Sequence, residues 1–206
     1  MKSFKQLLQE SYKDVPINES SIGRVAYHVN GSNVAIVTAH RSGNSVSENN
    51  ARNESLKKLI SEKGYGYVRV KGHYVEGYGS PTARDVNENA FLVVGKRGDD
   101  NGELLNDARS WGEHFSQDSI LHKKHDEDRA YLYGTGKHED AFPAYGHKFD
   151  VGVFHPNRAG EFYTALNSKN TFVFSESVNE GTVDYIFQDS YFKAKERAEQ
   201  LYFSLK

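Results

Sequence analysis

Short apolar runs of β type and longer helical stripes alternate along the chain, and a turn signal separates the first two runs. Residues 24–29 and 33–40 are rich in valine, alanine and isoleucine, and the segment NGSN links them. Asparagine followed by glycine between such runs favours a tight connection. The pattern therefore predicts a β-hairpin at the start of the body of the protein.

A helical stripe comes next. Leu56 and Ile60 recur with the spacing of one helix face, which predicts a helix over residues 47–64. The same stripe, extended towards the start of this helix, reaches Arg52 and Asn49. Two polar side chains are therefore expected on the inner face of the helix.

The remaining patterns predict further strands and helices. The predicted strands are residues 67–79, 90–95, 119–123, 130–136, 149–154, 171–177 and 182–187. The predicted helices are residues 103–115, 158–166 and 190–205, with polar loops at residues 79–87 and 137–148. Because strands and helices do not alternate regularly, we expect an α+β fold. Residues 23–206 would form a single compact domain with a mixed or mostly antiparallel sheet flanked by helices.

The N-terminus differs from this body. Phe4, Leu7 and Leu8 share one face of a predicted helix in residues 1–10, and a helix of roughly ten residues is marginal alone in water. The polar residues 11–22 predict a linker. The chain would thus consist of a short peptide, a linker and the α+β domain.

Composition limits the class of protein. The 206 residues include 37% hydrophobic residues and carry a formal net charge of −2, which argues against direct nucleic-acid binding through a basic surface. Cysteine is absent, so disulfides and thiol nucleophiles are excluded. No apolar run approaches the roughly 18 residues needed to cross a membrane. We expect no membrane partner and predict no cofactor.

The leading candidate site lies where a predicted strand ends and a helix begins. Thr38, His40 and Arg41 end the apolar run, and Asn49 and Arg52 share a face at the start of the helix. Helix N-termini attract anions, and arginine binds phosphate or carboxylate through two parallel hydrogen bonds. The alternative is that Asn49 and Arg52 only tie the helix to the adjoining loop, and residue chemistry alone favours that alternative.

Two further groups are weaker candidates. Glu76 and Glu88 flank a glycine-rich loop and could divide acid–base work between them, although most such carboxylates are solvated or bound to arginine. Six histidines in the third quarter of the chain are mixed with carboxylates, yet no metal-ligand spacing such as HExxH occurs, and residues 121–129 are expected to form a solvated hairpin tip. We therefore predict no metal. These histidines are His114, His122, His125, His138, His147 and His155.

The leading candidate residues belong to a longer pattern in residues 33–133. A strand ends in TA-x-R, a helix carries N-x-x-R-x-x-x-L, a strand contains two glycines, and E-x-A-F-L-V and F-x-Q-x-S follow. The matching residues are Thr38, Ala39, Arg41, Asn49, Arg52, Leu56, Gly66, Val70, Gly72, Tyr74, Glu88, Phe91, Leu92, Val93, Phe115, Gln117 and Ser119. The segment resembles an uncharacterised domain-of-unknown-function family of bacteria and tailed phages, although Ala90 stands where serine is expected. The resemblance implies no activity, but it adds Glu88 and Gln117 to the candidate site.

The opening segment carries a second resemblance. MKSFKQLLQE begins with Met-Lys and ends in Leu8-Gln9-Glu10, followed by Ser11. It is similar to the capsid-targeting peptides of internal head proteins of T-even-type phages, which a prohead protease cuts after the glutamate. The resemblance implies binding to the phage scaffold or prohead protease, and a location in the capsid interior of the virion and then in the host cytoplasm. The alternative is an ordinary helix docked on its own domain.

Two hypotheses of function follow. The leading one is a phage internal virion protein, packaged in the head and injected with the DNA, which binds or inhibits a host defence protein. The alternative is an enzyme or binding protein acting on a nucleotide or another phosphorylated small molecule. Its site would be the Thr38–Arg41 strand end with Asn49, Arg52 and Glu88. Whether any catalysis occurs is left open, and no catalytic residue is assigned.

Overall fold

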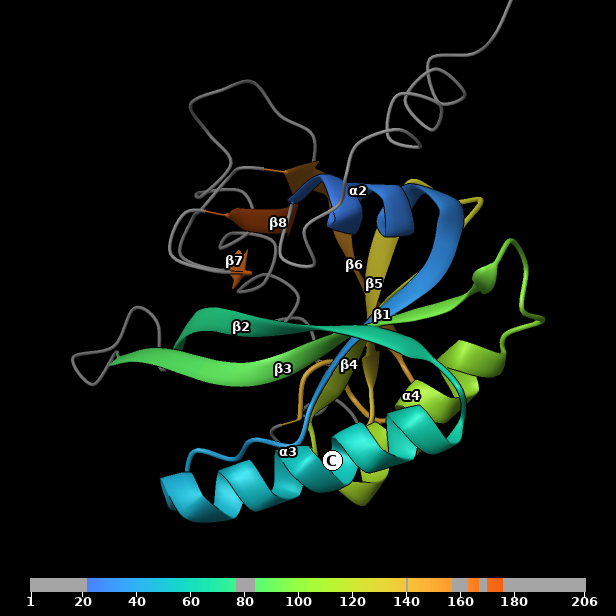
Figure 1. The fold of residues 1–206 in the computed structure, drawn as a ribbon. Coiled ribbons are helices and arrows are strands. Elements are labelled where there is room, and N and C mark those ends of the chain that lie inside the picture. Colours follow the sequence, from blue (N-terminus) through green and yellow to red (C-terminus); the bar gives the residue numbers. More distant parts are fainter. Residues whose placement is uncertain (1–21, 77–83, 140, 157–162, 167–169, 176–206) are drawn as a thin grey trace, which may run out of the picture.

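Residues 22–76, 84–139, 141–156, 163–166 and 170–175 are described by the computed structural model. In these residues the chain forms three helices and eight strands (Figure 1). In chain order they are α2 (Ile22–Gly31), β1 (Ser32–Thr38), α3 (Val46–Glu62), β2 (Gly66–Glu76), β3 (Arg84–Arg97), α4 (Glu103–His114), β4 (Ser119–Lys123), β5 (Arg129–Gly134), β6 (Lys148–Pro156), β7 (Tyr163–Ala165) and β8 (Thr171–Ser175). The predicted N-terminal helix, the strand at 182–187 and the helix at 190–205 lie outside the described residues.

The strands form a closed barrel in the order β1-β3-β2-β7-β8-β6-β5-β4. Each pair of neighbouring strands is antiparallel. The predicted α+β class and the antiparallel pairing are therefore confirmed, but the predicted flanked sheet is a barrel. Strand β1 pairs with β3 on one edge and β4 on the other, so the sheet closes on itself and loses its open edges. Hydrophobic periodicity reports which face of a strand is buried and does not report closure.

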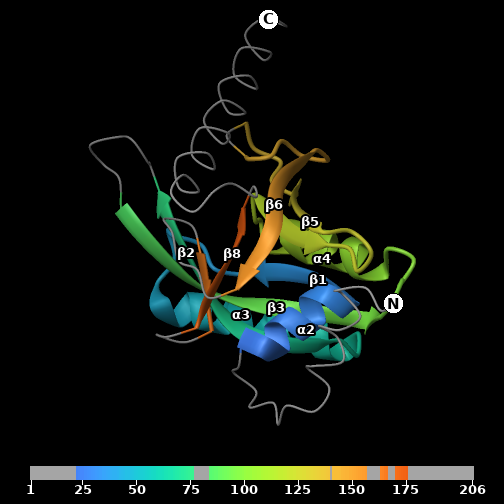
Figure 2. The same cartoon turned by 90° about the horizontal axis from the view of Figure 1, so that it is seen from above.

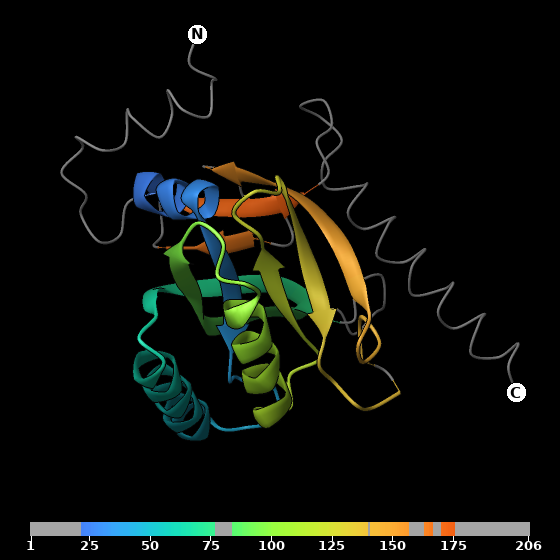
Figure 3. The ribbon, with the colours of Figure 1, turned by 90° about the vertical axis from the view of Figure 1, so that its right-hand side faces the viewer.

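The predicted hairpin at the start of the domain is wrong, because its first half forms helix α2. Val25 and Val29 are buried one helical turn apart and pack with Val34 and Leu92 in the interior of the barrel. Figures 1 and 3 show α2 lying across one end of the barrel, and in Figure 2 it is seen from above. A six-residue apolar run suits a strand or a buried helix turn equally, and tertiary burial decided between them.

Two other predicted elements are corrected. Residues 158–166 were expected to form a helix, but the part that the structure describes contains strand β7, which pairs with β2 and β8. The loop predicted over residues 79–87 overlaps the start of the long strand β3. In residues 163–165, local propensity for helix is thus overridden by pairing with strands on both sides.

Residues 39–45 connect β1 to helix α3, and a capping box stabilises the first turn of the helix. The Ser45 hydroxyl accepts a hydrogen bond from the Glu48 N–H at 3.3 Å, and the Glu48 carboxylate accepts one from the Ser45 N–H at 2.7 Å. The predicted start at Ser47 is therefore close to the observed one. The predicted end at Gly64 is confirmed, since this residue has a φ of 77° just after the helix.

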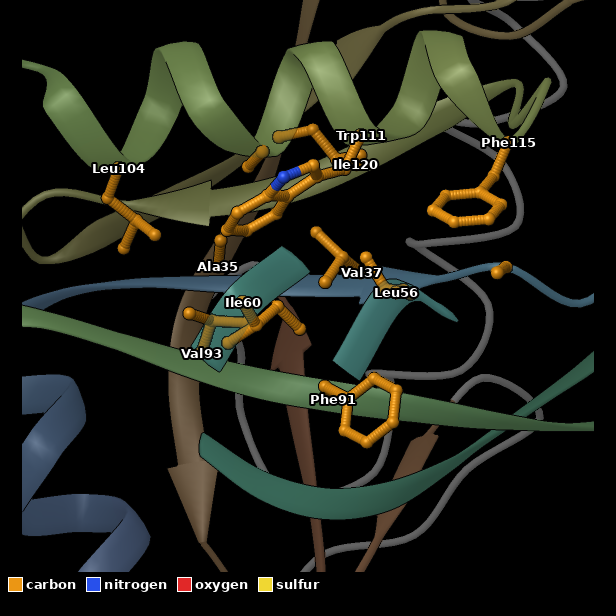
Figure 4. Packing of buried hydrophobic residues seen from close by; sticks show 12 residues of the cluster. Ala35, Val37, Leu56, Ile60, Phe91, Val93, Leu104, Trp111, Phe115 and Ile120 are labelled. Atoms are coloured by element: carbon orange, nitrogen blue, oxygen red, sulfur yellow. The ribbon is translucent and has the colours of Figure 1, made fainter. Parts of the chain in front are cut away.

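Helices α3 and α4 cover one part of the outer face of the barrel (Figures 1 and 4). Leu56 and Ile60 of α3 and Trp111 of α4 pack against outward residues of β1 and β3, including Val37 and Phe91. Fully burying a leucine or isoleucine side chain contributes about 1.5–3 kcal/mol. This packing brings the start of α3 and the end of α4 to the end of β1.

Helix α4 approaches the barrel closely at Gly112. A Cβ atom there would lie 2.8 Å from Ile120 Cγ2 and 2.8 Å from Thr135 Oγ1, so only glycine fits without displacement. The close contact fixes the last turn of α4 against β4. None of the described helices is long and apolar enough to cross a membrane.

Candidate functional site

The end of β1 is held by hydrogen bonds from two polar side chains. Asn53 of α3 accepts from the Ala39 N–H at 3.0 Å and donates to the Asn89 carbonyl at 3.1 Å. The Thr38 hydroxyl donates to the Asn89 carbonyl at 2.8 Å and accepts from the His40 N–H at 3.0 Å. These bonds lock the last residues of β1 to β3 and α3.

Asn49 and Arg52 hold the next residues of the loop. The Asn49 side chain accepts from the Arg41 N–H at 2.9 Å and donates to the Arg41 carbonyl at 3.0 Å. Arg52 donates from Nε to the Ala39 carbonyl and from Nη2 to the Phe115 carbonyl, each at 2.6 Å. Its guanidinium also lies over the Phe115 ring, 5.6 Å from the centroid. Both side chains therefore tie α3 to the loop, and Arg52 also ties it to the end of α4.

Gln117 completes this framework from the other side. Its side-chain amide is buried and donates to the His40 carbonyl at 2.9 Å and the Phe115 carbonyl at 3.2 Å. Four of the predicted site residues, Thr38, Asn49, Arg52 and Gln117, thus hydrogen-bond main-chain groups of residues 38–41 or their neighbours. They position the loop, whereas His40 and Glu88 contact each other and Arg41 contacts Ser116 and Asp118.

His40 and Glu88 come together at the barrel end opposite α2. Glu88 lies on the same face of β3 as Ala90 and Leu92, which point into the barrel. His40 Nδ1 is 3.4 Å from Glu88 Oε1, and the two side chains are only 21% and 15% exposed. The Nδ1 atom is shielded from water and makes no hydrogen bond of good geometry with the described residues. Electrostatic interactions are strengthened in such a partly dehydrated place, so the pair suits a cationic group or a proton transfer.

Arg41, the next residue of the loop, belongs to a second polar group. Its Nη1 donates to the Ser116 carbonyl at 2.7 Å and lies 3.2 Å from Asp118 Oδ1. The same carboxylate oxygen is 3.0 Å from His138 Nε2. The site thus carries two carboxylates, one guanidinium and two imidazoles.

Sequence reasoning missed three of these residues. Asn53 could have been found, because it lies one helical turn after Asn49 on the same stripe. Asp118 follows the predicted Gln117 but carries no pattern of its own. His138 was assigned to the histidine-rich region, and nothing in the sequence brings it beside residue 118.

Each of the two weaker candidate groups contributes one residue to this site, Glu88 and His138. The register of β2 and β3 places Glu88 opposite Gly72 but Glu76 opposite Arg84, several residues farther along the hairpin. No group of three or more metal-ligating side chains occurs within the described parts of the chain. His122 is buried on the outer face of the barrel beside Tyr133, and burial lowers its pKa to about 4.

The fold and the site define an α+β barrel protein with a small, partly buried group of charged side chains at one barrel end. The family model for the S-adenosylmethionine lyase family matches residues 35–175, about two thirds of the chain. The chain therefore belongs to the S-adenosylmethionine lyase family. The matched segment runs from β1 to β8 and includes His40, Arg41 and Glu88. A search of curated proteins found no match.

This membership corrects the leading hypothesis of the sequence. The interpretation as an internal head protein of a phage, with a body from an uncharacterised family, is wrong, because the match identifies a family of enzymes. Leu8, Glu10 and Ser11 lie outside both the matched segment and the described residues. The pattern Leu/Ile-x-Glu is also too short to be specific, since it recurs at residues 60–62 inside helix α3. The enzyme alternative agrees better with the family.

Proposed function

We propose that the protein is an enzyme that cleaves S-adenosylmethionine in a lyase reaction at the barrel end formed by His40, Arg41 and Glu88. The observation that carries this proposal is the family match, which spans the barrel strands and includes these three residues. The fold alone would not suffice, because one architecture supports many activities.

The charges of the site suit this substrate. S-adenosylmethionine joins adenosine to a methionine-derived chain through a positively charged sulfonium, and it contains no phosphate. The Glu88 carboxylate is 15% exposed and lies on the interior side of the barrel end. A carboxylate with little access to water attracts a cation more strongly than a solvated one. We therefore propose that the Glu88 carboxylate binds the positively charged sulfonium and does not protonate the leaving group.

The reaction breaks a carbon–sulfur bond, and the bonding electron pair goes to sulfur. The sulfonium becomes a neutral thioether, so the leaving group needs no proton. The carbon fragment reaches a stable product in one of two ways. A base removes a proton from the neighbouring carbon and a double bond forms, or the carboxylate of the substrate attacks the γ-carbon and closes a ring. Exclusion of water favours both routes over hydrolysis.

The two routes give the site residues different work. In the elimination route, the imidazole of His40 or the carboxylate of Glu88, 3.4 Å apart, takes the proton from carbon. In the ring-closing route no protein base is required, and Glu88 holds the sulfonium while the loop orients the chain. Substrate that carries two deuterium atoms on the β-carbon separates them, because elimination removes one deuterium from the carbon fragment and ring closure keeps both.

The test uses the full chain incubated with S-adenosylmethionine in water enriched in oxygen-18, followed by mass spectrometry at early times. We expect a thioether product, and a first-formed carbon fragment without oxygen-18. Glu88→Gln keeps the shape and removes the charge, and should lower kcat/KM by about 100-fold or more. Glu54→Gln, on the exposed face of α3, is the matched control and should leave turnover unchanged. Intact substrate with the wild-type protein would refute the proposal, and oxygen-18 in the first-formed fragment would indicate a hydrolase.

A further inference from the structure

Arg41 and Asp118 form a guanidinium–carboxylate pair whose backbone positions are fixed from both sides. Arg41 is held through its N–H and carbonyl by Asn49, at 2.9 and 3.0 Å. The carbonyl of Asp118 accepts from the Thr135 and Gly136 N–H groups at 2.8 and 2.9 Å. Two loops from different parts of the chain therefore present one ion pair in a defined geometry.

The pair has hydrogen-bonding capacity left over. Within the described parts of the chain, only Nη1 of the Arg41 guanidinium makes hydrogen bonds, to the Ser116 carbonyl and to Asp118. On Asp118 only Oδ1 is engaged, by Arg41 and by His138. Nε and Nη2 of the arginine and Oδ2 of the aspartate thus have no partner among those residues. The two side chains are 42% and 45% exposed, so a ligand can reach them.

The pair is linked to the His40–Glu88 pair through the main chain. Arg41 follows His40 in the loop, and Asp118 follows Gln117, whose side chain donates to the His40 carbonyl at 2.9 Å. The same loop thus carries one member of each pair, and we treat the two pairs as two ends of one site.

We propose that Arg41 and Asp118 determine specificity by binding the amino-acid end of S-adenosylmethionine. The guanidinium binds the α-carboxylate, and the Asp118 carboxylate binds the α-ammonium. Both substrate groups are attached to one carbon, and the two protein groups are 3.2 Å apart, so one ligand end can contact both. The inference rests on the proposed function, because it assigns the second half of the same substrate.

The charge balance supports this assignment. The pair of Arg41 and Asp118 is neutral in sum, and so is an α-amino acid group with its carboxylate and ammonium. Each substrate charge meets its opposite without leaving a net charge at the site. Loss of one partner would leave a charge without its counterpart on the ligand, which weakens binding selectively.

The experiment compares the dissociation constants of two ligands for the full-length protein, measured by equilibrium binding and by competition between the two ligands. One is S-adenosylmethionine, and the other is its decarboxylated form, which keeps the sulfonium and the amine but has no carboxylate. Arg41→Gln should weaken binding of S-adenosylmethionine by about 10- to 100-fold, as expected for a charged hydrogen-bond pair. Binding of the decarboxylated form should change less than about twofold. Asp118→Asn should weaken both ligands, since both contain the amine.

Controls separate the possible outcomes. Arg41→Lys keeps the charge but not the planar fork and should give an intermediate loss, which covers the case in which Arg41→Gln does not fold. Arg69→Gln removes an exposed arginine paired with Glu54 and should affect neither ligand. Equal weakening of both ligands by Arg41→Gln, or none, would overturn the assignment while the proposed function stands. If the wild-type protein binds neither ligand, the proposed function fails as well.

Discussion

Arg52 offers the sharpest test of how the site is built, because the structure assigns its hydrogen bonds to the main chain. Arg52→Met keeps much of the length of the side chain and removes the bonds to the carbonyls of Ala39 and Phe115, each 2.6 Å long. A hydrogen bond to a charged group contributes about 1.5–3 kcal/mol. Arg52 is only half-buried, so in the variant water can form some of the hydrogen bonds that the two carbonyls lose. We therefore expect a loss of about 2–4 kcal/mol in the free energy of unfolding.

Such a loss is readily measured by urea denaturation and by thermal unfolding. For a domain of this size, about 1 kcal/mol corresponds to roughly 2–4 °C in Tm, so Tm should fall by roughly 4–16 °C. Arg69→Met is the matched control, because Arg69 also pairs through Nη2 at 3.0 Å, with Glu54, but both side chains are largely exposed (64% and 58%). Its loss should stay below about 1 kcal/mol.

The two measurements also distinguish support of the loop from contact with a ligand. If Arg52→Met keeps the wild-type Tm but loses activity, the arginine acts on the substrate and our assignment of its hydrogen bonds to the loop is refuted. If stability falls as expected, the residual activity reports how far the loop at residues 38–41 tolerates the loss of one tie.

Two further predictions concern the barrel around the site. His122 has its pKa lowered by burial to about 4 from an ordinary 6.5, so between these pH values the unfolded chain binds a proton that the folded chain does not. The free energy of unfolding should therefore fall by up to about 3 kcal/mol as pH decreases through this window. Urea unfolding curves at several pH values should show a smaller fall for His122→Leu than for the wild-type protein. The same fall in both proteins would contradict the prediction. Gly134→Ala would place a Cβ against the carbonyl oxygens of Pro143 and Ala144, which are main-chain atoms that cannot easily move. This substitution should lower the free energy of unfolding, measured by urea denaturation, by about 1–3 kcal/mol or more. Gly66→Ala is the control and should be nearly neutral, because open space surrounds Gly66. Equal effects of the two substitutions would contradict the packing described at Gly134.

The sequence predicted the helices and strands that depend on local pattern. The stripe of Leu56 and Ile60 with Asn49 and Arg52 identified α3 and its inner face, since period and capping residues act within one helix. Most strands were found in the same way. The wrong predictions concern segments whose structure depends on contacts with residues far along the chain. The run at residues 24–29 forms a helix because its apolar side chains pack against residues in the interior of the barrel.

The candidate site shows the same division. The sequence brought together Thr38, Arg41, Asn49 and Arg52, because they flank a single strand–helix connection. Residue chemistry also favoured a tie between helix and loop for Asn49 and Arg52, as observed. The sequence could not place Asp118 or His138 beside them, since those contacts join residues 77 and 20 positions apart. Residue type and spacing determine what chemistry a side chain offers. Only the closed barrel, which sets the distances between loops at one end, decides which side chains meet and which are used up in holding the main chain.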